Sequence, residues 1–176
     1  MEPEQEKIKS AFSRISGTLA KRPAFGLGTG ISKATIKNGL TCEIKEGSFT
    51  LTADMPEQAG GNAAGPTPGV YGRAALGSCL AIGYMMRAAT MGIAIESLTV
   101  EVQADYDDGA LFGTAAADVP PGYLDIRYSV TIDSDAPEED IMRLLDEADK
   151  HSPYLDVFSR AQTCRRRVNI VTSKHR

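Results

Sequence analysis

The chain has 176 residues, 42% of them hydrophobic and 24% charged, with a formal net charge of −4. This size and balance are typical of one soluble globular domain that can bury a sizeable core. The acidic balance, and the lack of a basic stripe through the body of the chain, argue against a nucleic-acid partner.

We predict a single domain over residues 1–176, with an N-terminal helical extension at 1–23, a core at 24–172 and a basic tail at 173–176. The first residues contain no apolar stretch behind a basic start, and no run of 18 apolar residues occurs. We therefore expect neither a signal peptide nor a membrane partner.

The cysteines indicate a reducing compartment. Cys42, Cys79 and Cys164 are odd in number and include no CxxC pair, which favours free thiols over a disulfide framework. Two histidines are too few for a convincing zinc site. We expect a cytoplasmic protein that needs no metal ion or other cofactor.

The first third of the chain predicts one helix and three strands. Residues 4–20 carry an apolar stripe at helical spacing and end before Pro23. Residues 30–54 contain three short β-forming runs, separated by the turn sequences Asn38-Gly39 and Glu46-Gly47. Cys42 falls on the apolar face of the second run, so we expect it in the core.

The next segments are a glycine- and proline-rich stretch and an unusually apolar helix. Residues 55–69 suit either a flexible linker or a loop that needs backbone freedom beside a site. Residues 70–92 are apolar nearly all round, with only Arg73 and Arg87 charged, and a helix of this kind is normally buried. Gly92 is suited to end it.

The last part of the chain predicts two long strands, two helices and a final strand. The strands are expected at 98–106 and 124–132, because polar and apolar residues alternate there, and the final one at 168–171. Helices are expected at 137–150, with Ser134 or Asp135 as N-cap, and at 154–160. The triplet Asp105, Asp107 and Asp108 is better explained by a turn at Asp107-Asp108-Gly109 than by calcium binding. The order of elements indicates an α+β fold.

Three segments in this order resemble the OsmC/Ohr family over residues 30–172. They are the loop at 60–68, the helical segment at 74–81 around Cys79, and residues 148–154. The resemblance implies an OsmC/Ohr-like α+β fold, with antiparallel sheets packed around a buried central helix in an intertwined homodimer. A helix that is apolar all round agrees with this, because it needs more cover than one small layer provides.

The resemblance also implies a chemistry. Family members reduce organic hydroperoxides, and often hydrogen peroxide, with a thiolate that becomes a sulfenic acid. A second cysteine condenses with it to a disulfide, and a thiol reductant resets the pair. An arginine steadies the thiolate, and a glutamate holds the arginine.

This sequence keeps only part of that site. Cys79 matches the peroxidatic cysteine, but Ser152 stands where the second cysteine is expected and cannot form a disulfide. Gly69 takes the place of the glutamate. Arg73, one turn further on, is a candidate to reach the emptied position, and Arg22 is the other candidate for the arginine.

Three functions remain open on the sequence alone. The first is a one-cysteine hydroperoxide reductase in oxidative stress defence, with Cys79 reset by an external thiol or, less simply, by Cys164. The second is a non-catalytic homodimer that binds a small apolar ligand, in which Cys79 is only a small buried hydrophobe. The third is a hydrolase-like site that pairs Cys79 with His151.

Overall fold

The computed structural model describes residues 3–171. Its helices are α1 (Pro3–Lys21), α2 (Pro68–Met91), α3 (Asp108–Phe112), α4 (Glu138–Asp149) and α5 (Pro153–Ser159), with 3-10 turns η1 (Pro23–Gly26) and η2 (Glu57–Ala59). Its strands are β1 (Lys33–Thr35), β2 (Cys42–Glu46), β3 (Phe49–Ala53), β4 (Ser97–Asp105) and β5 (Asp125–Asp133). The α+β class and most of the expected elements are confirmed.

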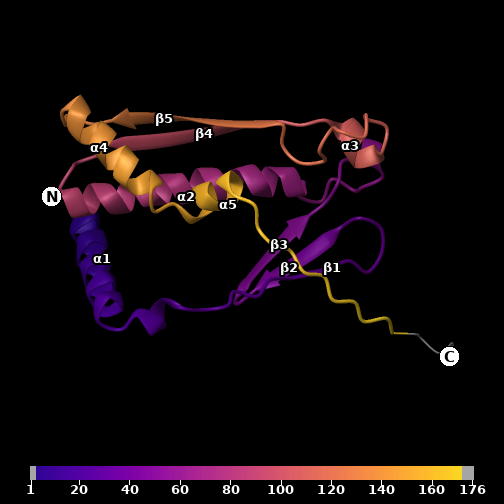
Figure 1. Ribbon diagram of the computed structural model, residues 1–176, viewed down its shortest axis with the longest axis horizontal. Coiled ribbons are helices and arrows are strands. Elements are labelled where there is room, and N and C mark those ends of the chain that lie inside the picture. The colour runs from indigo at the N-terminus through magenta and orange to yellow at the C-terminus, as the bar shows by residue number, and fades with distance from the viewer. Residues whose placement is uncertain (1–2, 172–176) are drawn as a thin grey trace.

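Helix α2 lies at the centre of the arrangement (Figure 1). The long β4–β5 hairpin covers one side of it, and α4 and α5 also pack against α2. The antiparallel sheet β1-β2-β3 lies on the other side, beyond the start of α2. Helix α1 packs against the C-terminal end of α2. There the Gln5 Nε2 donates to the Ile93 carbonyl at 2.6 Å, and the Arg87 guanidinium lies 5.6 Å from the Phe12 ring centre.

The core is built from one face of α2. Leu76, Leu80, Tyr84 and Ala88 recur at intervals of four and are each 1% exposed. They pack against Leu144 and Ala148 of α4 and the inward residues of β4 and β5. Strand residues there alternate between exposed and half-buried, as their sequence pattern predicts. Burial of each large apolar side chain in this face contributes about 1.5–3 kcal/mol.

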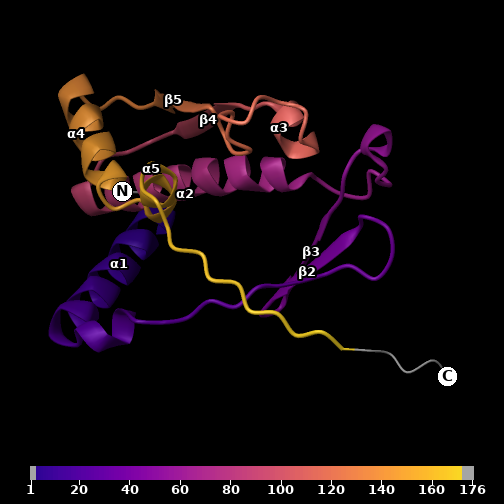
Figure 2. The ribbon, with the colours of Figure 1, turned by 45° about the vertical axis from the view of Figure 1, so that its right-hand side comes forward.

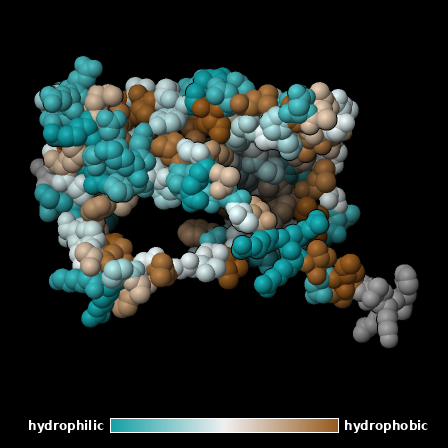
Figure 3. Space-filling model, in the orientation of Figure 1, coloured by the Kyte–Doolittle hydropathy of each residue, from teal (hydrophilic) through white to brown (hydrophobic). Residues whose placement is uncertain are grey.

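The other face of α2 is open. Ile82 is 61% exposed and Met86 is 38% exposed. The chain therefore buries one side of the helix that the sequence predicts to be buried all round. Figure 3 shows a window through the molecule below α2, bordered by α1 and the segment that leads from it towards β1.

Three details of the sequence-based expectation are wrong. Residues 168–171 are extended but form no strand, because no neighbouring strand pairs with them within 3–171. Ser134 and Asp135 do not cap α4, whose N-cap is Pro137; the Ser134 hydroxyl instead donates to the Ala94 carbonyl at 2.5 Å. Asp107-Asp108-Gly109 is not a simple turn but opens α3, with Asp107 accepting from the Gly109 N–H.

One further expectation is confirmed, and another lies outside the described part of the chain. Gly92 ends α2 with a φ of 71°, the left-handed conformation that glycine adopts most easily. Among residues 3–171, no helix is both long and apolar enough to span a membrane. The basic tail predicted at 173–176 lies outside the described residues.

Candidate functional site

Cys79 and Ser152, which are far apart in sequence, meet between α2 and the start of α5. The Cys79 Sγ lies 3.6 Å from the Ser152 Oγ, within hydrogen-bond distance for sulfur. Cys79 is half-buried and Ser152 is 8% exposed. The structure therefore places a hydroxyl beside the thiol at the position where the resemblance expects a second thiol.

The local sequence explains how Ser152 reaches this place. Pro153 cannot continue α4 but suits the first turn of a new helix, and Ser152 is a favourable N-cap. The Ser152 Oγ accepts a hydrogen bond from the Leu155 N–H at 3.3 Å. Because the oxygen is the acceptor in that bond, the hydroxyl proton is free to point at the Cys79 sulfur.

A half-buried carboxylate, that of Asp149, lies near this pair. Tyr84 of α2 and Tyr128 of β5 each donate a hydrogen bond of 2.7 Å to the side chain of Asp149, the last residue of α4. Burial, followed by these bonds to Asp149, raises the pKa of Tyr84 far above its ordinary value and that of Tyr128 to about 12. Both hydroxyls therefore remain donors throughout the neutral range.

Sequence reasoning missed this cluster, although a signal was present. Tyr84 falls on the apolar face of the central helix, and Tyr128 falls at an inward position of its strand. A tyrosine hydroxyl that is buried or half-buried requires a partner, so two of them predict an acceptor nearby. The identity of that acceptor depends on packing between α2, β5 and α4, which local patterns do not specify.

The Arg73 side chain lies beside the space that a larger side chain at position 69 would occupy. Its Nη1 is 3.5 Å from the point where a Cβ on Gly69 would stand, and the Tyr123 hydroxyl donates to the Gly69 carbonyl at 2.9 Å. Gly69 precedes Cys79 by ten residues, which is about 15 Å along a helix axis. The guanidinium is thus drawn towards the start of α2, and no contact between it and Cys79 is seen in the described part of the chain.

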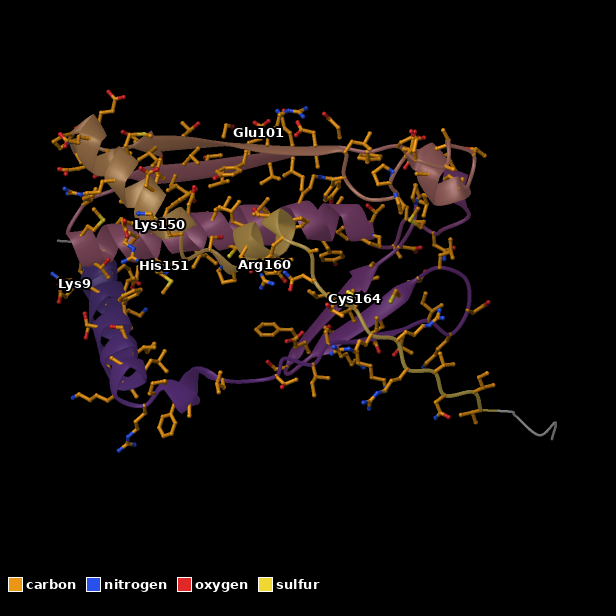
Figure 4. All side chains as sticks on the ribbon, in the orientation of Figure 1. Lys9, Glu101, Lys150, His151, Arg160 and Cys164 are labelled. Atoms are coloured by element: carbon orange, nitrogen blue, oxygen red, sulfur yellow. The ribbon has the colours of Figure 1, made fainter. Side chains whose placement is uncertain are left out.

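The remaining candidates lie away from the Cys79–Ser152 pair. The Arg22 guanidinium lies 5.4 Å from the ring centre of Phe25, beyond the end of α1. Cys164 is exposed in the extended segment after α5, at the side of β1–β3 (Figure 4). His151 is also exposed and makes no side-chain hydrogen bond to Cys79 within residues 3–171. Asp105 pairs with Arg127 at 2.6 Å, which accounts for one of the aspartates considered for calcium.

Cys42 is half-buried rather than fully enclosed in a core. It lines an open, mostly apolar pocket of about 450 Å³ beside the β1–β3 sheet, together with Ile36, Leu40 and Ile44. Its thiol lies next to the Glu43 carbonyl at 3.9 Å. The pocket is formed at the sheet rather than around Cys79.

The glycine- and proline-rich segment before α2 is a tightly wrapped loop rather than a free linker. Asp54, which is 2% exposed, accepts hydrogen bonds from the Thr41 hydroxyl and from three backbone N–H groups of the loop, those of Met55, Asn62 and Ala64. Side chains on Gly61 and Gly65 would collide with the carbonyls of Met55 and Thr52. The segment is therefore an ordered loop rather than a flexible linker, and it needs glycine at both positions.

Comparisons with known proteins agree with the fold and with the order of the motifs. A sequence model of the family described as OsmC-like protein matches residues 60–165. No curated protein matches the chain by sequence. The OsmC-like protein of Mycoplasma pneumoniae is similar in structure, with a TM-score of 0.64 at 20% identity over 75% of this chain and 88% of that chain.

Two further solved structures are similar. The organic hydroperoxide resistance protein OsmC of Legionella pneumophila gives a TM-score of 0.54 at 19% identity, over 75% of this chain and 90% of that chain. The OsmC-like hydroperoxide resistance protein of Jannaschia sp. CCS1 gives 0.51 at 20% identity, over 80% and 91%. At these identities the likeness shows a common fold.

Proposed function

Because this chain belongs to the OsmC-like protein family, we propose that it is a one-cysteine hydroperoxide reductase with Cys79 as its nucleophile. Some of the similar structures are of proteins named for hydroperoxide resistance. The observation that carries the proposal is the 3.6 Å contact between the Cys79 thiol and the Ser152 hydroxyl, at the position matching the family's pair of cysteines.

The first half of the reaction consumes the peroxide. The Cys79 thiolate attacks the distal oxygen of the hydroperoxide, so that an S–O bond forms as the O–O bond breaks. The sulfur is oxidised to a sulfenic acid, and the alkoxide leaves and takes a proton from water to become the alcohol. The Ser152 O–H, directed at the sulfur, stabilises the thiolate before the attack.

The second half requires a thiol from outside the chain. Ser152 cannot condense with the sulfenic acid to form a disulfide, and the exposed Cys164 lies elsewhere (Figure 4). One external thiol displaces water from the sulfenic acid and forms a mixed disulfide. A second external thiol attacks the outer sulfur of the mixed disulfide, which releases the Cys79 thiol and leaves the two external thiols joined as a disulfide. Three free cysteines are consistent with a reducing cytoplasm that supplies such thiols, and with a role in oxidative stress defence.

We also propose that the working form is an intertwined homodimer. The open face of α2 and the window beside it leave Ile82 and Met86 exposed in one chain. The second sheet adds Phe49 and Leu51, which are 72% and 47% exposed. Apolar surface of this extent is characteristic of an interface. A second copy would cover it and give a bulky, apolar peroxide its binding walls.

The test is intact-mass analysis after addition of one equivalent of an organic hydroperoxide in the presence of dimedone, which traps sulfenic acids. We expect rapid formation of a single adduct that is lost in Cys79→Ser and retained in Cys42→Ser and Cys164→Ser. Absence of an adduct, with Cys79 still reduced, would contradict the proposal. It would favour a dimer that keeps the fold to bind a small apolar ligand.

A further inference from the structure

The cluster formed by Asp149, Tyr84 and Tyr128 joins three elements that are separate in the sequence. The carboxylate receives two hydrogen bonds of 2.7 Å, one from α2 and one from β5. Tyr84 is 1% exposed, so its hydroxyl has no access to water as an alternative partner. Hydrogen bonds from hydroxyls to a carboxylate are short and strong, and they fix the carboxylate at two points.

The backbone of the same aspartate carries the turn that presents Ser152. The Asp149 carbonyl accepts a hydrogen bond from the Ser152 N–H at 3.1 Å. On the other side of the site, Tyr84 follows Cys79 by little more than one turn of the rigid helix α2. A short connected path therefore runs from Cys79 along α2 to Tyr84, across to Asp149, and back through the turn to Ser152.

The two residues between the cluster and Ser152 bond only within α4: the His151 N–H donates to the Ala148 carbonyl at 3.0 Å, and the Lys150 side chain pairs with Glu147. Neither side chain ties the turn to α2 or β5. Lys150 and His151 are both exposed, as Figure 4 shows at the end of α4. The contact between the Ser152 hydroxyl and the Cys79 sulfur is itself weak, since sulfur is a poor hydrogen-bond partner. Its length thus depends on what holds the turn, and a shift of about 1 Å would remove the contact.

We infer that Asp149 is a positioning residue, whose doubly bonded carboxylate holds the turn between α4 and α5 so that the Ser152 hydroxyl stays in contact with the Cys79 sulfur. Its meaning for peroxide reduction rests on the proposed function, whereas the positioning itself does not. Figure 2 shows the start of α5 lying against α2, close to where α4 ends.

The experiment measures the fraction of Cys79 present as thiolate at neutral pH, from the ultraviolet absorbance that each protein loses on Cys79→Ser. We expect Ser152→Ala to lower this fraction about threefold, because the thiolate loses a donor. In the Asp149→Ala background, where the turn is no longer held, Ser152→Ala should change the fraction by less than about 1.3-fold. The two substitutions would then be coupled rather than additive.

One control separates positioning from general stability, and a second test variant covers the case in which Asp149→Ala does not fold. Tyr71→Phe removes another half-buried tyrosine hydrogen bond, of 2.7 Å to the Thr52 carbonyl, far from this turn, and should leave the full effect of Ser152→Ala. If Asp149→Ala does not fold, Tyr84→Phe removes one of the two bonds and should reduce the effect at least partly.

The inference is overturned if Ser152→Ala has its full effect in the folded Asp149→Ala and Tyr84→Phe proteins, because the turn would then be held by other contacts. It is equally overturned if Ser152→Ala leaves the thiolate fraction of the otherwise unchanged protein as it was. No peroxide enters the measurement, so a failure of the proposed reductase activity would appear separately, in the dimedone experiment.

Discussion

The two faces of α2 differ in how they are buried, although both are apolar in sequence. Leu80 is 1% exposed beneath α4 and the β4–β5 hairpin, while Ile82, two residues later, is 61% exposed. The elements that cover Leu80 follow α2 in the same chain, whereas the described residues 3–171 leave most of the Ile82 side chain uncovered. One face thus belongs to the core of this chain, and the other fits an interface with a second copy.

The sharpest test of this difference substitutes alanine on each face. Leu80→Ala should lower the free energy of unfolding by about 2–5 kcal/mol at any protein concentration, because it leaves a cavity in the core. Ile82→Ala should lower the free energy of unfolding by less. If it acts through dimer formation, this loss should increase with protein concentration. Urea unfolding at several protein concentrations measures both. Equal, concentration-independent losses would contradict the distinction between the faces.

A charge on the open face should break the dimer without unfolding the chain. We expect Ile82→Glu to weaken dimer association about hundredfold, because an unpaired carboxylate would be buried at the interface. Light scattering on a gel-filtration peak measures the mass of each species. Thr99→Glu, on the exposed face of β4, is the matched control and should remain dimeric. A wild-type protein that is monomeric at every concentration would remove the basis for this proposal.

On the covered face, the position of Ser152 can be tested by restoring the second thiol. In Ser152→Cys, the sulfur introduced would lie near the Oγ position, 3.6 Å from the Cys79 Sγ, so a disulfide needs an approach of about 1.5 Å. After one equivalent of hydroperoxide, the sulfenic acid should condense with the new thiol and release water. We expect two alkylatable thiols to disappear together, with no external thiol added.

The control for that experiment is Ser159→Cys, which adds an exposed thiol at the far end of α5. It should lose only the Cys79 thiol under the same treatment. If both variants lost the Cys79 thiol together with the introduced thiol, the idea that one chain fixes the distance between positions 79 and 152 would be contradicted.

The sequence predicted the covered face better than the open one. Alternation in β4 and β5 and the four-residue spacing of Leu76, Leu80 and Tyr84 are local patterns, and each was confirmed. The final strand at 168–171 was wrong because a strand needs a neighbour, and β-forming residues alone do not provide one. Resemblance singled out Cys79 and Ser152, whereas Asp149 was missed because its partners come from two other elements.

The loop that joins β3 to α2 should make the stability of the fold depend on pH. A hydrogen bond from Thr41, followed by bonds from the backbone N–H groups, lowers the pKa of the Asp54 carboxyl below its ordinary value. A lowered pKa in the folded state means that this carboxylate stabilises the fold above the unfolded-state pKa of about 4. That stabilisation is lost as the pH falls through the lower, folded-state pKa.

We therefore expect Asp54→Asn to melt at a lower temperature than the wild type at pH 7, and the difference to narrow as the pH falls below about 4. Thermal unfolding followed by circular dichroism across this range measures the effect. Asp108→Asn, at an exposed position of α3, is a surface control and should lower the melting temperature at pH 7 less than Asp54→Asn does. A difference between Asp54→Asn and wild type that stays constant with pH would mean that the carboxylate charge does not hold the loop. The fixed path from β3 into α2, and with it the placement of the β1–β3 sheet relative to α2, would then depend on glycine packing alone.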